Sequence, residues 1–165
     1  MSADLPPVTP ASTRVEMTQI VLPPHTNNHG TAFGGQIAAW TDICASVAAR
    51  RFCRGPVVTV SMDQLHFVMP VKLGMIVILR GQVNQSWRTS MEIGVRIETE
   101  DSVTGVRAHA CTAYLTFVAL DEAGQPRPVP RVDTRDDPEA ERRASDAILR
   151  RESRLQVLAT RRAHR

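Results

Sequence analysis

Several features that would define a protein class are missing from this sequence. No apolar run approaches the roughly 20 residues that a membrane-spanning helix needs. The N-terminus lacks the basic and apolar regions of a signal peptide, so we expect a cytoplasmic protein. The three cysteines, Cys44, Cys53 and Cys111, lie in apolar segments without metal-ligand spacing, which predicts buried free thiols and no metal site. No Gly-x-Ser-x-Gly motif occurs, so nothing supports a serine-triad hydrolase.

Size and charge leave few other classes open. A chain of 165 residues can build one sizeable core but not two ordinary ones. The net charge of +3 could suggest nucleic-acid binding, but the arginines gather beyond Arg131, where they alternate with Asp and Glu. We therefore expect a solvated or self-pairing tail, with neither nucleic acid nor membrane as a partner. The small positive excess would still suit an anionic small ligand.

The composition divides the chain into three parts. Residues 1–12 carry Pro6, Pro7 and Pro10 among small residues, which predicts a flexible N-terminal arm. Residues 13–130 hold the apolar periodic segments and form the predicted domain. Residues 131–165 form a charged, Arg-rich extension with a helix predicted from Asp136 to Leu158, on a thin apolar stripe.

Within the domain, the periodicity predicts one helix and five strands. The helix runs from about Gly34 to Phe52 and ends before Gly55-Pro56. The predicted strands are Thr13–Leu22, Val58–Phe67, Met75–Gln85, Met91–Glu98 and Val106–Leu120. The second strand changes phase near Asp63-Gln64, which indicates a bulge, and the last is apolar on both faces, which favours a central position. Short connections favour antiparallel neighbours, so we expect an α+β fold with a curved sheet wrapped around the helix.

The predicted helix contains a carboxylate in an unusual setting. Its residues are apolar on nearly every side, which is typical of a buried helix. Asp42 and Ser46 interrupt this pattern on one face. A buried carboxylate normally pairs, takes up a proton or does chemistry, so Asp42 is a candidate catalytic residue.

The segments around Asp42 resemble a known family. With the spacing taken together, they are similar to the hotdog-fold acyl-CoA thioesterases, especially the short bacterial acyl-CoA thioester hydrolases and the repeats of the animal cytosolic acyl-CoA hydrolases. The resemblance spans about residues 14–130. It rests on Asn27-x-x-Gly30-x-x-Phe33-Gly34-Gly35, on Asp42 in the helix, on Val58-Thr59-Val60 before Phe67, and on Pro70-Val71-x-x-Gly74.

This resemblance implies a fold, an activity and a set of site residues. The fold would be the hotdog, with two long helices side by side in a dimer, active sites at the interface, and often a trimer of dimers. Asp42 would be the general base or nucleophile, and Asn27 would hold the attacking water or the thioester. The backbone N–H of Gly34 or Gly35 would bind the carbonyl oxygen. The chain departs from many bacterial relatives at His29, where they carry a second asparagine, and at Thr31.

The spacing of these groups predicts a composite site. Gly34 and Asp42 lie eight residues apart, which is about 12 Å along one helix. One carbonyl group cannot easily meet both. Two antiparallel helices across a two-fold axis would bring Gly34 of one protomer to Asp42 of the other, so we expect a homodimer as the minimum unit.

Other assignments are weaker at the sequence level. Thr59 could face the site from the neighbouring strand, and the loop residues Arg88, Thr89 and Ser90 could bind the phosphates of coenzyme A, although a plain polar turn fits the same loop. No cofactor is expected, because coenzyme A belongs to the substrate. Water attack is the simpler mechanism, and attack by Asp42 itself through a mixed anhydride stays open.

Two other functions remain as alternatives to hydrolysis. A non-catalytic acyl-CoA sensor is one, although the segment 1–12 is too short for a DNA-binding module. The other is a hotdog enoyl-CoA hydratase, which would need a histidine beside the acid, and only His29 keeps it open.

Overall fold

Five antiparallel strands form a single sheet in the order β1-β3-β4-β5-β2. The computed structural model describes residues 5–163. Each predicted strand is confirmed within a few residues, and β5 lies inside the sheet as expected, between β4 and β2. The strands are β1 (Val15–Ile20), β2 (Val57–Phe67), β3 (Ile76–Ser86), β4 (Ser90–Glu100) and β5 (Arg107–Ala119).

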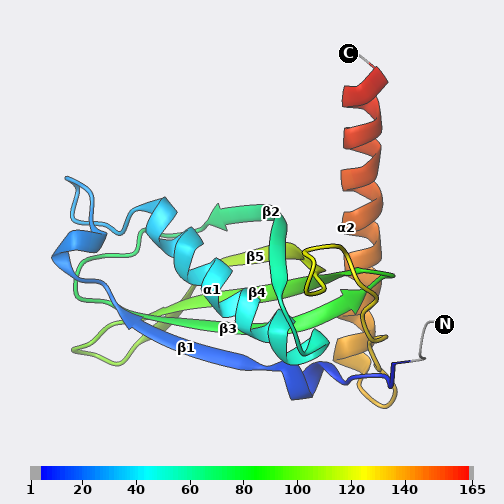
Figure 1. Cartoon of the computed structure of the whole chain (residues 1–165). Helices are drawn as coiled ribbons and strands as arrows, with labels where there is room; N and C mark the ends of the chain where they lie inside the picture. The colour runs from blue at the N-terminus through cyan, green and yellow to red at the C-terminus, as the bar shows by residue number, and fades with distance from the viewer. Residues whose placement is uncertain (1–4, 164–165) are drawn as a thin grey trace.

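The long helix α1 (Gly34–Cys53) lies across the concave face of this sheet (Figure 1). It contacts all five strands, so the expected hotdog arrangement of a sheet wrapped around a helix is confirmed. Its buried side presents Ile37, Cys44, Ala48 and Phe52, each at most 1% exposed. The helix ends at Cys53 and is capped by Arg54, which adopts the left-handed conformation with φ 52°, just before the predicted Gly55-Pro56 stop.

One side of α1 is open in the single chain. Gly35, Ala39 and Ile43 are spaced four residues apart and are all exposed, with Ile43 at 52%. Residues at this spacing form one stripe along a helix. The expectation of a helix buried on all sides therefore holds only where the sheet covers it, and the uncovered stripe is apolar.

Strand β2 forms one edge of the sheet and is irregular. Its pairing with β5 shifts between Asp63 and His66, where the sequence predicted a bulge, and also between Thr59 and Ser61. Val60 is 61% exposed, so β2 combines an unpaired strand edge with uncovered apolar side chains. Such an edge is a template for pairing with another chain.

The second helix, α2 (Pro138–Ala163), packs on the opposite, outer face of the sheet and extends further than predicted. It begins where the carboxylate of Asp137 accepts a hydrogen bond from the N–H of Ala140 (3.0 Å). Its buried residues are Ala140, Ala144 and Ala147. The helix then continues past β2 and stands clear of the sheet (Figure 1).

The N-terminal segment reaches the same end of the molecule as the start of α2. Residues 1–4 of the predicted arm lie outside the described residues, and Val8 forms a bridge with Val132. No helix within residues 5–163 is long and apolar enough to cross a membrane.

Candidate functional site

Asp42 projects from α1 towards β2 and meets Thr59 there. The Thr59 hydroxyl donates a hydrogen bond to Asp42 Oδ1 at 2.7 Å. Asp42 is half-buried, so it is neither the sealed charge that the helix pattern suggested nor a freely solvated one. The bond fixes one carboxylate oxygen and leaves the other without a hydrogen-bond partner among the described residues. The structure thus brings together two of the candidate residues.

Asn27 organises the loop that leads into α1. Its Oδ1 accepts hydrogen bonds from the backbone N–H of His29 (2.9 Å) and of Thr31 (3.3 Å), and its Nδ2 donates to the Thr31 hydroxyl (3.0 Å). The loop turns at Gly30, which has φ 71° and so requires a residue without a Cβ. Thr31 is therefore a structural partner of Asn27, a link that the sequence did not reveal. Asn27 itself remains partly exposed.

The first amides of α1 point away from the helix without protein acceptors. The N–H groups of Gln36 and Ile37 both donate to the Phe33 carbonyl, whereas within residues 5–163 those of Gly34 and Gly35 have no acceptor. A Cβ placed on Gly35 would meet nothing within 4 Å. Unpaired N–H groups at the positive end of a helix suit an anionic oxygen, so this helix start can bind developing charge.

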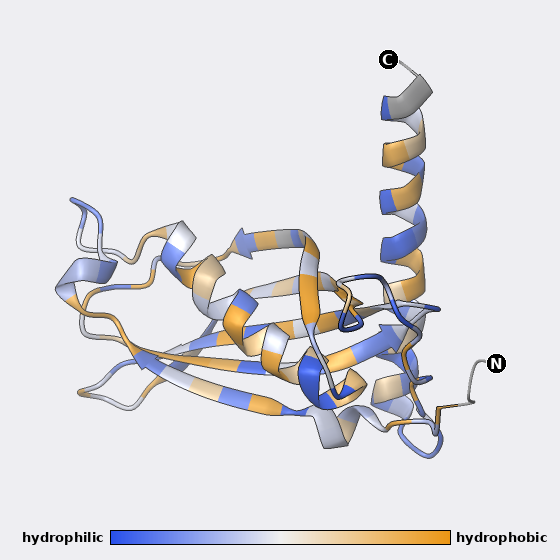
Figure 2. Ribbon diagram, viewed as in Figure 1, coloured by the Kyte–Doolittle hydropathy of each residue, from blue (hydrophilic) through white to orange (hydrophobic). Residues whose placement is uncertain are grey.

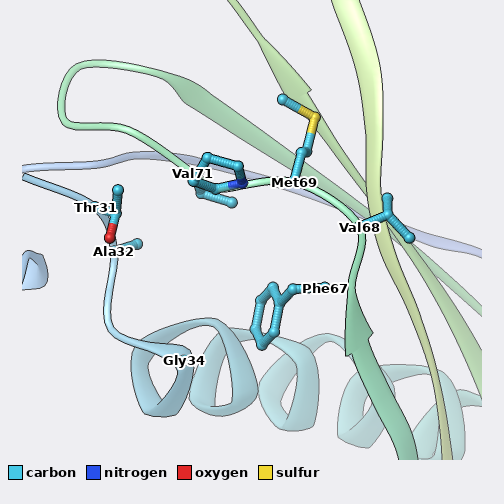
Figure 3. A pocket seen from close by; sticks show the side chains of 8 residues that line it. Thr31, Ala32, Gly34, Phe67, Val68, Met69 and Val71 are labelled. Atoms are coloured by element: carbon cyan, nitrogen blue, oxygen red, sulfur yellow. The ribbon is translucent and has the colours of Figure 1, made fainter.

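A cavity of about 360 Å³ opens beside this helix start (Figure 3). The ring of Phe67, at the end of β2, stands over Gly34, so that a Cβ on Gly34 would lie 3.6 Å from Phe67 Cε2. Val68, Met69 and Val71 complete an apolar wall. The position of Phe67 follows from β2 running back along α1, which places the end of the strand at the start of the helix.

The two reactive features lie at different points of the same helix. Gly34 and Asp42 are separated by about 12 Å along α1. On the neighbouring strand β2, Thr59 lies beside Asp42, and Phe67 lies beside Gly34. A single chain therefore presents an acid and a set of free amides that do not face one common point.

The polar loop of Arg88, Thr89 and Ser90 lies at the opposite end of the molecule from Gly34. Ser90 pairs with Val118 of β5, which in turn pairs with Val58 at the start of β2. The Thr89 carbonyl accepts from the N–H of Ala119 (3.0 Å), while Arg88 is exposed. The structure does not bring this loop to the Gly34 amides of its own chain.

The ring of His25, at the start of the loop, has ordinary contacts. His25 Nδ1 accepts from the backbone N–H of Leu22 (3.1 Å), and the His25 ring packs edge-on against Trp40, with centroids 5.0 Å apart. Nowhere in the described part of the chain do three His, Cys, Asp or Glu side chains gather as metal ligands.

Sequence comparisons place the chain among thioester hydrolases. The thioesterase superfamily profile matches residues 29–106. An uncharacterized acyl-CoA thioester hydrolase of Bacillus subtilis is 44% identical over 119 residues, which cover 72% of this chain and 69% of that protein. Acyl-coenzyme A thioesterase 11 of Mus musculus is 39% identical over 145 residues, or 87% of this chain. The chain spans only 24% of the length of that mouse protein.

Solved structures give the same result over nearly the whole fold. A hexameric acyl-CoA thioesterase in its apo form has 36% identity and a TM-score of 0.89, covering 94% of this chain and 99% of the other. An acyl-CoA hydrolase of Staphylococcus aureus, solved with butyryl coenzyme A and coenzyme A, has 32% identity and a TM-score of 0.79, covering 94% and 98%. Alanine variants of that enzyme replace an asparagine, an aspartate and a threonine with the same spacing as Asn27, Asp42 and Thr59.

Proposed function

The chain belongs to the thioesterase superfamily, among its acyl-CoA thioester hydrolases, and on that premise we propose that it hydrolyses acyl-CoA to a free carboxylic acid and coenzyme A. The observation that carries the proposal is the pair of features on α1. Asp42, held by Thr59, supplies a base, and the free amides of Gly34 and Gly35 supply an anion site. Thioester hydrolysis needs both.

The proposed reaction uses these groups in one addition and one elimination. Water attacks the thioester carbonyl carbon while Asp42 takes a proton from it, and Asn27 orients the water or the substrate. The carbonyl oxygen becomes an oxyanion, which the Gly34 and Gly35 N–H groups stabilise. Collapse of this intermediate breaks the carbon–sulfur bond. The thiolate of coenzyme A leaves and receives the proton from Asp42.

We propose that the two halves of the site come from two protomers of a homodimer. The exposed stripe of Gly35, Ala39 and Ile43 would pack against the same stripe of a second α1 in antiparallel orientation. Ala39 lies at the centre of the stripe and lets the helices approach closely. Gly34 of one protomer then lies beside Asp42 of its partner, which removes the separation of about 12 Å.

The edge strand β2 supports the same dimer. In each chain, Thr59 of β2 lies beside Asp42, and Phe67 of β2 lies beside Gly34. If β2 pairs with its own copy in antiparallel orientation, Asp42 meets the partner's Gly34 only when Thr59 lies opposite the partner's Phe67. The two-fold axis then passes β2 midway between these residues, at Asp63. This pairing would cover Val60, which is 61% exposed in the single chain.

Other parts of the proposal rest on the family. The loop of Arg88, Thr89 and Ser90, distant from its own Gly34, would contact the phosphates of coenzyme A bound at one of the shared sites. We also propose a trimer of dimers, because a similar structure is named hexameric. We propose a cytoplasmic location, because a relative in Mus musculus is named a cytosolic acyl coenzyme A thioester hydrolase.

A panel of acyl-CoAs of different chain lengths, with a chromogenic thiol reagent, tests the activity. Release of coenzyme A should occur with the wild type and fall by at least about 100-fold with Asp42→Asn, which keeps the shape and removes the base. Asp136→Asn, the same change at an exposed residue before α2, is the matched control. Binding without release at any chain length would indicate a sensor instead, and hydration of an enoyl-CoA without release would indicate a hydratase.

A further inference from the structure

Helix α2 is held to the outer face of the sheet by two ion pairs. Arg150 binds Glu92 of β4 through Nη2–Oε1 (2.7 Å) and Nε–Oε2 (3.1 Å), and its guanidinium lies 3.6 Å from the centre of the Tyr114 ring on β5. Glu92 is 0% exposed, so its charge depends on this partner. One turn later, Arg154 binds Asp63 of β2. The helix also contacts β3, so along its length it crosses β3, β4, β5 and β2 in the order of the sheet.

The face that docks on the sheet continues beyond its edge. Its residues are spaced four and three positions apart in turn, which is the period of one helix face: Ala140, Ala144, Ala147, Arg151 and Arg154. Leu158 follows at the next step. Arg154 already lies over the edge strand. Leu158 and the residues up to 163 thus extend over the place where β2 has no neighbour, and no other described segment of the chain lies there (Figure 1).

This projecting part of α2 is not purely polar. Leu149 is 63% exposed and Val157 51%, and with Met62, Ser153 and Leu158 they form the uncharged part of a groove of about 570 Å³ between the helix and β2. The rest of the lining is charged and consists of Asp63, Arg150, Arg154 and Arg161. Figure 2 shows apolar residues recurring along this part of the helix. Exposed apolar side chains that line one groove mark an interaction surface.

We propose that this groove receives the same helix of the partner protomer, so that the two α2 helices pack antiparallel across the outer face of the dimer. This inference rests on the proposed β2 pairing. The site geometry places the two-fold axis at Asp63, and Asp63 is the residue that Arg154 binds. The neighbour of Arg154, Ser153, is flanked four residues away on each side by Leu149 and Val157.

The two centres of symmetry coincide although they come from different parts of the chain. One is deduced from the positions of Thr59 and Phe67 along β2, and the other from the apolar pattern of α2. An antiparallel helix pair centred on Ser153 sets Leu149 against the partner's Val157, twice per dimer, with a small residue at the crossing. The helices pack about 8–10 Å apart, so each must lie to one side of the axis.

The consequence is a second dimer contact on the face opposite the active sites. Each α2 bridges the β2 seam, fastened to its own sheet by Arg150 and Arg154 and to the partner by Leu149 and Val157. The extension would thereby hold together the interface at which Asp42 and Gly34 meet.

A disulfide test addresses this arrangement directly. In an antiparallel pair centred on Ser153, the two Ser153 side chains face each other across the axis, so oxidised Ser153→Cys should run almost completely as a covalent dimer on a non-reducing gel, with the activity retained. Leu155→Cys, about 200° further around the helix, is the control and should stay monomeric on the gel. The native cysteines are buried and do not interfere. Equal cross-linking of both variants, or none by Ser153→Cys in a protein that is dimeric and active, would overturn the proposal.

Further variants separate failure of this proposal from failure of the active-site dimer. Val60→Glu in the Ser153→Cys background breaks the β2 seam and should abolish the cross-link, whereas its persistence would assign the α2 contact to a different interface and overturn the proposal. Leu149→Glu and Val157→Lys should each raise the dimer dissociation constant about 30-fold. The double variant, in which the two opposite charges meet across the interface, should regain most of the lost affinity. Within one chain these positions lie about 12 Å apart, so recovery requires the partner.

Discussion

Replacing Gly34 by proline removes one proposed oxyanion donor while sparing the helix. Gly34 is the first residue of α1, where proline is tolerated because its N–H makes no helical hydrogen bond. Phe33, the preceding residue, has ψ 135°, within the extended range of ψ that a residue before proline prefers. Fold and helix start should therefore survive.

The expected loss can be bounded from other oxyanion holes. Removal of one donor lowers kcat by about 100- to 1000-fold, equivalent to about 2.7–4 kcal/mol. Gly34→Ala is the matched control, because it keeps the N–H and its Cβ would lie at an ordinary 3.6 Å from Phe67 Cε2. It should retain activity within about threefold.

The assay is steady-state release of coenzyme A, with thermal unfolding to verify that both variants fold. The loss should fall on kcat, because the oxyanion exists only in the transition state and the intermediate. A folded Gly34→Pro enzyme with the same kcat as Gly34→Ala would refute the role of the Gly34 N–H.

Three more predictions follow from the contacts of the described residues. Thr59→Val removes the hydrogen bond to the proposed base and should lower kcat about tenfold, whereas Thr59→Ser should restore most of it. Burial raises the pKa of the Cys44 and Cys111 thiols to about 11 and also raises the pKa of Cys53, so at pH 8 the folded protein should not consume the thiol reagent, and a rapid reaction would contradict the burial of these three cysteines. Arg150→Ala leaves Glu92 buried without its cation and should cost about 3 kcal/mol of stability in urea unfolding; an unchanged midpoint would show that the pair is dispensable.

The sequence predicted those features of the fold that depend on residues close together in the chain. The apolar run from Gly34 predicted α1, and the phase change near Asp63 predicted the bulge in β2, because both depend on residues close in the chain. The proposal of a second protomer also starts from a local quantity, the distance along one helix between Gly34 and Asp42. The side-chain period, however, could not distinguish a face covered by the sheet from the one exposed around Ile43.

Contacts between distant segments were not predictable. The bond from Thr59 to Asp42 depends on how β2 returns along α1, and the ion pair of Arg150 with Glu92 joins residues 58 positions apart. In the sequence Glu92 stands between the apolar residues Met91 and Ile93, an alternation typical of a solvent-facing position, yet it is buried because α2 covers the outer face. Only the tertiary structure shows which charges that helix brings into contact with the sheet.

A mixed-dimer experiment tests the composite site most directly. Asp42→Asn and Gly34→Pro chains, each inactive alone, are co-expressed with different tags, and total activity is compared with that of the wild type. A site shared between protomers gives each mixed dimer one intact site, so random mixing should recover about one quarter of the wild-type activity. Formation of mixed dimers without any recovery of activity would place Asp42 and Gly34 in the same site of one chain and contradict the account.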